Sequence, residues 1–433
     1  MNKISILIIA FIFFSNCSFN ENSRIWNGKG KNKNSINEKN LKKLFVEEEI
    51  ISSEFNPELE INITKININD KASINRNDYG SQNYKGLLKK EVGYTFSKLE
   101  NINKLDFKPI FLSDGIIFFD KKGTIIKYND NKIVWKNNYY TKAEKKLGPK
   151  LHFAITDNIL LVADNIAKYY SINLNTGELN WSKNSAYPFN SEIKKNENKF
   201  FVVDYKNTLR CYNINDGSEC WNIQTEDSFT ISSSKFSLIL MNDLIIFSNS
   251  IGDITAIDTD TGLINWQLPT QSSSIINKTY RFKISKLVSD GKSIFFSNNK
   301  NEFYSINARS GTINWINKIN SNITPVISQN LIVTVSNNGY LFVVQKDKGN
   351  IIRITDLYKD YNNKNRENIT PIGFAVGKNT LYLTSNNGKM VVVDLRFGNI
   401  IKEIKFSGKL VSEPLIFNEK LFLVRNGSII RYN

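Results

Sequence analysis

The residue types that most often do chemistry in proteins are scarce in this sequence. It has one histidine, His152, and three cysteines. A zinc or c-type haem site needs histidine and cysteine ligands close together, and we therefore interpret His152 as an ordinary strand residue. No Ser/His/Asp pattern and no glycine-rich phosphate loop is recognisable in the sequence either. These observations predict a protein without catalytic, metal or cofactor sites.

Carboxylates recur near the predicted hairpin turns, at Asp216, Asp258, Asp260 and Asp347. Repeated acidic side chains could hold a cation. Their setting is a repeated turn of the Asp/Asn-x-x-x-Gly type, in which such side chains accept hydrogen bonds from the backbone. We therefore predict that they cap turns.

The first cysteine marks a predicted lipid attachment site. An apolar run from Ile4 to Phe14 follows a lysine, which is typical of a secretory signal and too short to span a bilayer. The run ends in the sequence Phe-Ser-Asn-Cys at 14–17, which resembles a bacterial lipobox. We predict a signal peptide over 1–16 and acylation of Cys17, and Ser18 after it implies the outer membrane. An ordinary signal peptide with an incidental cysteine is the alternative.

The other two cysteines, Cys211 and Cys220, flank the turn of one predicted hairpin. In an oxidising periplasm they could form a cross-strand disulfide. The sequence does not fix the register of the two strands, so two free thiols remain the alternative.

One motif organises most of the chain: a glycine, three residues, then a tryptophan at the end of a short strand. The motif, or a degenerate copy of it, recurs every 38 to 49 residues, a period that fits one four-stranded blade of a β-propeller. The complete copies are Gly177 to Trp181, Gly217 to Trp221, Gly262 to Trp266 and Gly311 to Trp315; Trp135 lacks the glycine, and the copies at Gly349 and Gly398 have Arg353 and Lys402 in place of tryptophan.

Each copy divides into four apolar runs separated by turn residues, as an antiparallel meander does. The last segment, 413–433, has only three such runs. A propeller commonly completes its final blade with a strand from the other end of the chain, which removes an open edge, and Tyr94–Leu99 is the best candidate. We predict an all-β, eight-bladed β-propeller of four-stranded antiparallel blades over 92–433, closed by an N-terminal strand, with seven blades as the alternative.

Residues 17–91 differ from the repeats because they have few aromatic residues and many Asn, Lys, Glu and Ser residues. This composition predicts a lipidated, largely disordered tether. The chain carries a formal net charge of +16, but its lysines are scattered among turns. Proteins that bind nucleic acid usually cluster their positive charge, so we expect no nucleic-acid partner.

The segment Ala256–Trp266 and its degenerate copies resemble the repeat of quinoprotein-like (PQQ-like) propellers. With the lipobox, the length and the blade number, the chain is similar to the BamB-like lipoproteins of the outer-membrane β-barrel assembly machinery. The resemblance covers about 92–433. It implies that the repeat glycine supplies a turn and that the tryptophan packs between blades. It also implies a non-catalytic scaffold that faces the periplasm, binds the core barrel subunit and unfolded outer-membrane clients, and aids their insertion.

The resemblance further implies partner-binding loops at one end of the central blades. Matching places these loops near 229–236 and 280–283. The candidate contacts are Phe229, Ser233, Phe236, Arg281 and Lys283. Where the family carries two acidic residues in the second loop, this chain has Arg281 and Lys283, which implies a contact surface of changed charge.

Two alternatives belong to other functional classes. A PQQ- and Ca²⁺-dependent oxidoreductase needs a catalytic aspartate, oxygen ligands for the cation and usually a vicinal cysteine pair against the cofactor, and the sequence has no Cys-Cys dipeptide. A generic protein-binding propeller of the cell envelope would share every feature described above, so the sequence does not separate it from an assembly scaffold.

Overall fold

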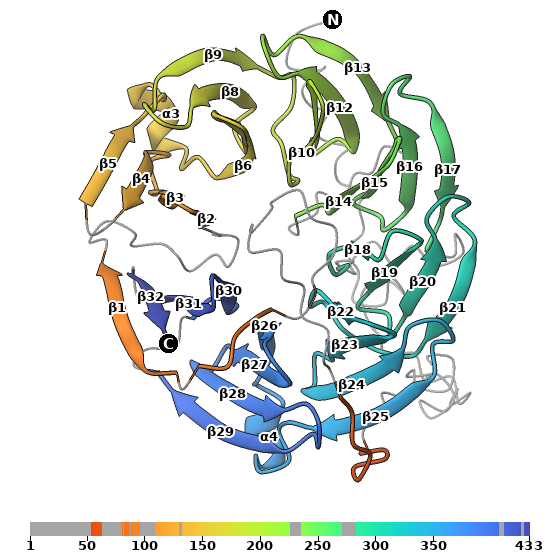
Figure 1. Ribbon diagram of the computed structural model, residues 1–433. Helices are drawn as coiled ribbons and strands as arrows, with labels where there is room; N and C mark the ends of the chain where they lie inside the picture. The colour runs from red at the N-terminus through yellow and green to blue at the C-terminus, as the bar shows by residue number, and fades with distance from the viewer. Residues whose placement is uncertain are drawn as a thin grey trace, which may run out of the picture. The chain divides into compact units, whose positions relative to one another are not determined.

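The computed structural model describes residues 53–62, 80, 82–86, 88–95, 109–129, 132–225, 235–270, 283–406, 411–425 and 428–433. All of them belong to one unit, Ile50–Asn433. Their strands form eight four-stranded sheets set around a central axis (Figure 1), which confirms the eight-bladed propeller and excludes seven blades. Among the helices of these residues, none has both the length and the apolar character that a membrane span requires.

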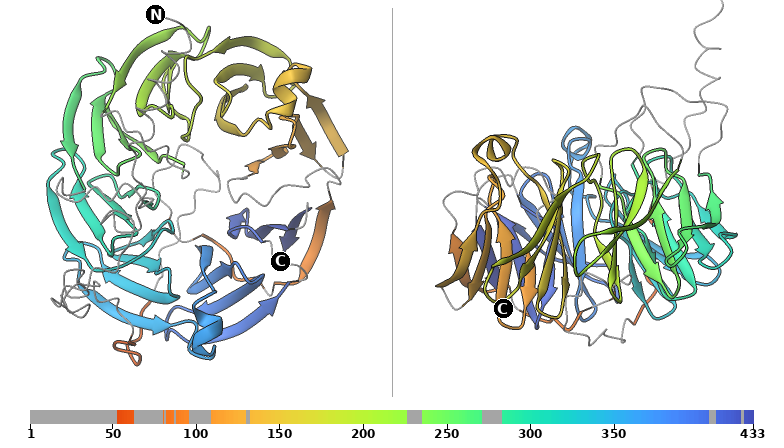
Figure 2. Two further views of the ribbon diagram at one scale, coloured as in Figure 1. Left: turned by 180° about the vertical axis from the view of Figure 1, so that it is seen from behind. Right: turned by 90° about the horizontal axis from the view of Figure 1, so that it is seen from above.

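In blades 1 to 7 the strands pair antiparallel in chain order, and the first strand lies nearest the axis; in blade 8 the innermost strand is β30 and the outermost is β1 (Figures 1 and 2). Blade 1 contains β2 (Ile110–Leu112), β3 (Gly115–Phe119), β4 (Ile125–Asn129) and β5 (Lys132–Asn137); blade 2 contains β6 (Leu151–Thr156), β7 (Ile159–Asp164), β8 (Lys168–Asn173) and β9 (Leu179–Asn184). Blade 3 contains β10 (Lys194–Asn196), β11 (Lys199–Val203), β12 (Thr208–Asn213) and β13 (Glu219–Gln224); blade 4 contains β14 (Leu238–Met241), β15 (Leu244–Ser248), β16 (Ile254–Asp258) and β17 (Ile264–Leu268).

The second half of the ring repeats this plan. Blade 5 contains β18 (Val288–Ser289), β19 (Ser293–Ser297), β20 (Phe303–Asn307) and β21 (Ile313–Asn317); blade 6 contains β22 (Val326–Ser328), β23 (Leu331–Val335), β24 (Tyr340–Gln345) and β25 (Ile351–Asp356). Blade 7 contains β26 (Pro371–Val376), β27 (Thr380–Ser385), β28 (Lys389–Asp394) and β29 (Ile400–Lys405); blade 8 contains β30 (Leu415–Phe417), β31 (Lys420–Arg425), β32 (Ser428–Tyr432) and β1 (Lys90–Thr95). Two short helices, α3 (Lys142–Lys146) and α4 (Asn363–Arg366), lie in connections between blades.

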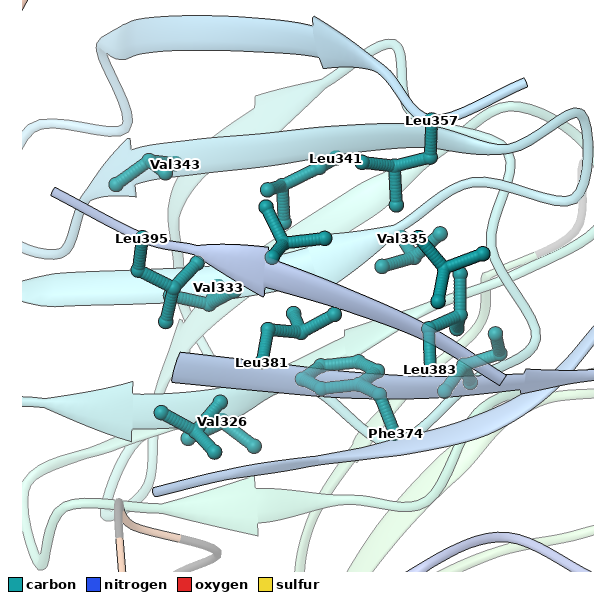
Figure 3. Close-up of a cluster of buried hydrophobic side chains, with 14 of the residues drawn as sticks. Val326, Val333, Val335, Leu341, Val343, Leu357, Phe374, Leu381, Leu383 and Leu395 are labelled. Atoms are coloured by element: carbon teal, nitrogen blue, oxygen red, sulfur yellow. The ribbon is translucent and has the colours of Figure 1, made fainter. Parts of the chain in front are cut away.

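The hydrophobic core is divided into layers between neighbouring blades, because successive residues of a strand point to opposite faces. In β23, Val333 and Val335 pack against Phe374 and Leu381 of blade 7 (Figure 3). Ile332, the residue before Val333, points to the opposite face and packs with residues of blade 5 such as Phe295. A strand that is buried on both faces reads as a continuous apolar run, which explains the uninterrupted runs of the sequence.

The N-terminal strand closes the ring, as predicted, but it lies earlier in the chain than expected. β1 pairs antiparallel with β32, with Gly93 opposite Ile430. The closing strand thus begins at Lys90, four residues before the predicted start at Tyr94, and residues 96–99 of the predicted strand lie outside the described residues. Lys89 and Asn433 exchange two backbone hydrogen bonds of 3.0 Å at the start of this pairing. These bonds fix a register that the sequence pattern did not reveal.

The repeat motif links each of blades 1 to 5 to the blade that follows it. Trp315 at the end of blade 5 donates its indole N–H to the carbonyl of Lys346, three residues before Gly349 of blade 6, at 2.9 Å. A Cβ atom on Gly349 would lie 2.6 Å from the indole ring, and the φ of +74° also favours glycine. The same bond joins Trp135 to Leu174, Trp181 to Ile214, Trp221 to Thr259 and Trp266 to Ala308. We call this contact the blade lock.

Arg353 forms a blade lock of its own in the copy that lacks tryptophan. Its guanidinium donates to the carbonyl of Leu395, again three residues before the repeat glycine, Gly398, and to the carbonyl of Arg396 at 2.8 Å. Arg353 is fully buried. Its planar fork therefore replaces the single indole donor with several donors.

The additional donors hold a segment of the predicted tether, residues 54–61, which we call the strap. Arg353 donates to the carbonyl of Leu59 at 3.0 Å, and Phe55 exchanges two backbone hydrogen bonds of 3.0 and 3.1 Å with Ile354 at the outer edge of blade 6. Ile61 is buried in the core between blades 6 and 7. The sequence did not predict that this part of the tether packs on the propeller.

We expect Gly311→Ala to destabilise the blade lock between blades 4 and 5. The added Cβ would lie 2.6 Å from the Trp266 ring at a φ of +71°, and overpacking together with left-handed strain costs about 2–4 kcal/mol. Gly148→Ala is a matched control, because Gly148 has a φ of +67° but no atom within 4 Å of the added Cβ. Denaturant unfolding measures both variants. Equal losses would show that the indole contact is unimportant.

We expect Arg353→Ala to release the strap while the ring stays closed. The variant removes the guanidinium, and with it the hydrogen bonds to the carbonyls of Leu59, Arg396 and Leu395. The amides of Phe55 and Ile61 should then exchange hydrogen faster, since each bond that held the segment stabilised it by about 1 kcal/mol. Hydrogen exchange with mass spectrometry tests this, with Arg309→Ala, an exposed arginine, as control. Unchanged protection of the strap would contradict the expectation.

Candidate functional site

The antiparallel meander gives the ring two different ends. One end, which we call the loop end, carries the starts of the innermost strands and the turns between second and third strands. These turns are capped by one acidic or amide side chain: the Asp204 carboxylate accepts from the amides of Lys206 and Thr208 at 2.8 and 3.1 Å. The opposite end carries the glycine turns of the blade locks. Both kinds of turn are closed by hydrogen bonds, but only the loop end also carries the connections between blades.

The carboxylates singled out in the sequence mostly support glycine turns. Asp258 accepts from the amides of Asp260 and Thr261 at 3.0 and 2.7 Å, and Asp216 accepts from the amide of Ser218 at 2.8 Å. Asp260 instead pairs with Lys199 at 2.7 Å. Within the described ranges, no three or more His, Cys, Asp and Glu side chains are grouped so that they could hold a metal ion.

A group of charged side chains gathers at the starts of three innermost strands of the loop end. Glu192 precedes β10 in blade 3, and Lys286, which precedes β18 in blade 5, donates a hydrogen bond to its carboxylate. This ion pair joins two blades that are not neighbours in the ring. The ammonium of Lys194 lies 3.9 Å from the same carboxylate, and Lys235 from blade 4 acts on it electrostatically. We call these four residues the charged cluster.

The charged cluster combines burial with strong ion pairing. Burial acts to raise the pKa of Glu192, but the charges of Lys286, Lys194 and Lys235 outweigh it and hold that pKa well below its usual value. Burial lowers the pKa of Lys194 to about 8, although Glu192 opposes this shift. Glu192 is therefore ionised at neutral pH and organises the lysines around it.

His152 lies beside this cluster in β6. It is paired with Ala163 in the sheet, as expected of a strand residue. Burial lowers its pKa well below the usual value, and the positive charge of Lys235 acts in the same direction. The imidazole is therefore neutral at physiological pH.

The predicted partner contacts are only partly within the described residues. Lys283 is exposed, and its backbone is bound to the turn at Asn299 by two hydrogen bonds of 3.0 Å, which places it at the loop end. Phe236 is buried in the core between blades 3 and 4. Phe229, Ser233 and Arg281 lie outside the described residues, as does Cys17. Cys211 and Cys220 are free thiols.

The charged cluster was not predicted from the sequence. Glu192 and Lys194 alternate around Ile193 at the start of an innermost strand. Charged residues in such a place are unusual, because innermost strands such as β14 and β22 begin with buried apolar residues. This local pattern was a usable signal. Lys286 could not be linked to it, because the pairing crosses 94 residues of sequence.

We expect Glu192→Gln to destabilise the protein at neutral pH by on the order of 3 kcal/mol, since it leaves the buried Lys194 and the half-buried Lys286 without their carboxylate. The folded-state pKa of Glu192 is lowered from 4.5, so the stability that it contributes is present above pH 4.5 and is lost as the pH falls further. The difference in the free energy of unfolding between wild type and variant should therefore become smaller below pH 4.5. Denaturant unfolding at several pH values measures it.

Asp260→Asn is the control for this prediction. It breaks an ion pair whose carboxylate side chain is 82% exposed, and exposed pairs contribute less than about 1 kcal/mol. If Glu192→Gln lowers the free energy of unfolding by the same amount at pH 7 and below pH 4.5, Glu192 is not the ionised centre of the cluster.

Comparison with solved structures places this fold among propellers of two functional kinds. BamB from Moraxella catarrhalis is 14% identical, with a TM-score of 0.65 over 80% of this chain and 100% of that one. The quinohemoprotein alcohol dehydrogenase ADHIIG from Pseudomonas putida HK5 is 10% identical, with a TM-score of 0.59 over 84% and 81%. A europium-containing methanol dehydrogenase is 10% identical, with a TM-score of 0.62 over 85% and 89%. At these identities the likeness shows the fold alone.

Comparison at the level of sequence is more specific. No curated protein matches the chain. The family model described as outer membrane protein assembly factor BamB, however, matches residues 121–355, which is more than half of the chain and extends from blade 1 to blade 6. With its eight PQQ-like blades and their tryptophan locks, the chain belongs to the BamB family of propellers.

Proposed function

We propose that the protein is a non-catalytic, lipid-anchored scaffold of the outer-membrane β-barrel assembly machinery. It would be attached through Cys17 to the outer membrane and face the periplasm, where it binds the core barrel subunit and aids the insertion of outer-membrane proteins. The observation that carries the proposal is the match of the assembly-factor family model over residues 121–355. The predicted lipobox supports the location.

The loop end is the surface that we propose for the core subunit. Lys283 is exposed there and is held by the turn at Asn299. The charged cluster lies at the starts of the innermost strands of blades 3 to 5, which are also at the loop end. Its lysines add positive potential to this end. This surface would receive an acidic region of the partner, and Phe229, Ser233 and Arg281, which lie outside the described residues, remain predicted contacts of that region. Phe236 is buried and would not touch the partner, but it packs in the core between blades 3 and 4.

The strap suggests how unfolded clients would bind. Phe55 adds to the outer edge of β25 through a pair of backbone hydrogen bonds, which is β-augmentation within one chain. Outer strands of other blades expose apolar side chains beside their edges, as Ile313 and Ile316 do on β21 and Ile264 does on β17. We propose that client strands add to such edges in the same way.

The main rival is a quinone-dependent oxidoreductase, because two of the similar structures are dehydrogenases. The vicinal cysteine pair that usually clamps this cofactor has no counterpart in the sequence. Purified protein reconstituted with PQQ and Ca²⁺ should therefore reduce no dye in the presence of alcohols or sugars. Dye reduction under these conditions would overturn the scaffold assignment.

We expect the core barrel subunit to co-purify with the tagged lipoprotein from its own membrane in mild detergent, and Lys283→Glu to reduce its recovery about tenfold, which corresponds to about 1.4 kcal/mol. The reason is that reversal of the charge opposes the acidic partner surface. Lys292→Glu is a matched control, because Lys292 is also exposed in blade 5 but lies in the turn between β18 and β19 at the opposite end.

Mass spectrometry of the eluate distinguishes the outcomes. Recovery of the subunit with Lys292→Glu but not with Lys283→Glu supports both the pathway and the surface. Equal recovery with the two variants would reject the surface. Absence of every assembly subunit from the wild-type eluate would reject the pathway and favour a generic envelope propeller.

A further inference from the structure

The outermost strands of blades 1 to 7 share a β-bulge next to the position of the repeat tryptophan. In blade 2, Ser171 is opposite Trp181 and the next residue, Ile172, is opposite Leu179, which leaves Asn180 as the extra residue. The same shift occurs at the equivalent place in the other six blades. A bulge of this kind turns two neighbouring side chains toward one residue of the partner strand.

The bulge brings a specific pair of side chains together: the extra residue and the residue opposite the tryptophan position. In blade 2, the Asn180 side chain donates to the Ser171 hydroxyl at 3.0 Å. In blade 5, Asn314 donates to the Ser305 hydroxyl at 3.1 Å. These two blades show that the geometry of the repeat places the side chains of this pair in contact.

In blade 3 the two members of this pair are both cysteines. Cys211 is opposite Trp221, and Cys220 is the extra residue of the bulge. Cys211 is completely buried and Cys220 is exposed. Burial raises the pKa of the Cys211 thiol, and the neighbouring Cys220 thiol raises it further. The register that the sequence left open is therefore one that brings these two thiols together.

We propose that Cys211 and Cys220 are a site of disulfide formation within blade 3. The exposed Cys220 thiolate attacks a disulfide oxidant, of which glutathione disulfide is the simplest, and releases one glutathione thiolate. The Cys211 sulfur gives up its proton and displaces the second glutathione from Cys220. The two cysteines lose two protons and two electrons in total, and one glutathione disulfide is reduced to two molecules of glutathione.

The bond would join β12 to β13 beside the blade lock of Trp221, whose indole contacts Gly262 of blade 4. It would therefore link β13, the outermost strand of blade 3, covalently to β12. The bulge, which blades 2 and 4 also have, would stay unchanged. This inference needs neither the partner nor the clients of the proposed function. It depends on the register of one hairpin and, in the cell, on the oxidising compartment that the proposed location supplies.

The experiment incubates the purified full-length protein with glutathione disulfide, blocks free thiols with iodoacetamide in denaturant, and analyses the digest by mass spectrometry. Trypsin leaves both cysteines in one peptide, 211–235, because no lysine or arginine separates them. The expected product is this peptide, unalkylated and two hydrogen atoms lighter than its reduced form. Cleavage after Glu219 should then leave two fragments that separate only on reduction.

Cys220→Ser supplies the matched control. Its remaining thiol, Cys211, is buried, so the folded variant should resist both glutathione and iodoacetamide. Recovery of the wild-type peptide with both cysteines alkylated would overturn the proposal, and so would a linkage between two protein molecules. Rapid modification of Cys211 in folded Cys220→Ser would show that the hairpin does not protect this thiol, which would also reject the site.

Discussion

The packing of blades 1 to 7 on one another depends on one repeated contact, the blade lock between the end of one blade and the glycine turn of the next. An indole donates to a carbonyl three residues before a glycine, and the glycine has no side chain that would separate the two blades. Because the contact requires a donor, a flat surface and a left-handed turn together, it sets the relative rotation of neighbouring blades. The apolar layers between blades add most of the burial but have less directional preference.

The lock also explains which sequence changes the repeat accepts. Arg353 replaces tryptophan without loss of the contact, since its guanidinium is flat and donates to the same carbonyl position. The exchange adds donors that tryptophan lacks, and the strap uses one of them at Leu59. A position that appears degenerate in sequence is thus the one at which the ring holds the N-terminal segment.

The fold could be predicted from the sequence because its signals are local and repeated. Glycine turns, tryptophan positions and apolar runs recur in most blades, so a degenerate copy can be recognised from the others. The register of β1, the strap and the charged cluster could not be predicted, because each pairs residues far apart in sequence, such as Glu192 with Lys286. The loop residues proposed for the partner came from a resemblance. Of these, only Lys283 and Phe236 lie within the described residues.

The position of the strap has a mechanical consequence. Chain order places the strap before the closing strand β1, so a pull on the N-terminus loads the strap first. Its backbone bonds at Phe55 and the Arg353 contact at Leu59 take up the force, and the pairing of β1 with β32 is shielded until they break. If the protein is anchored at Cys17 as we propose, the strap would bear the pull of the anchor and protect the pairing of β1 with β32.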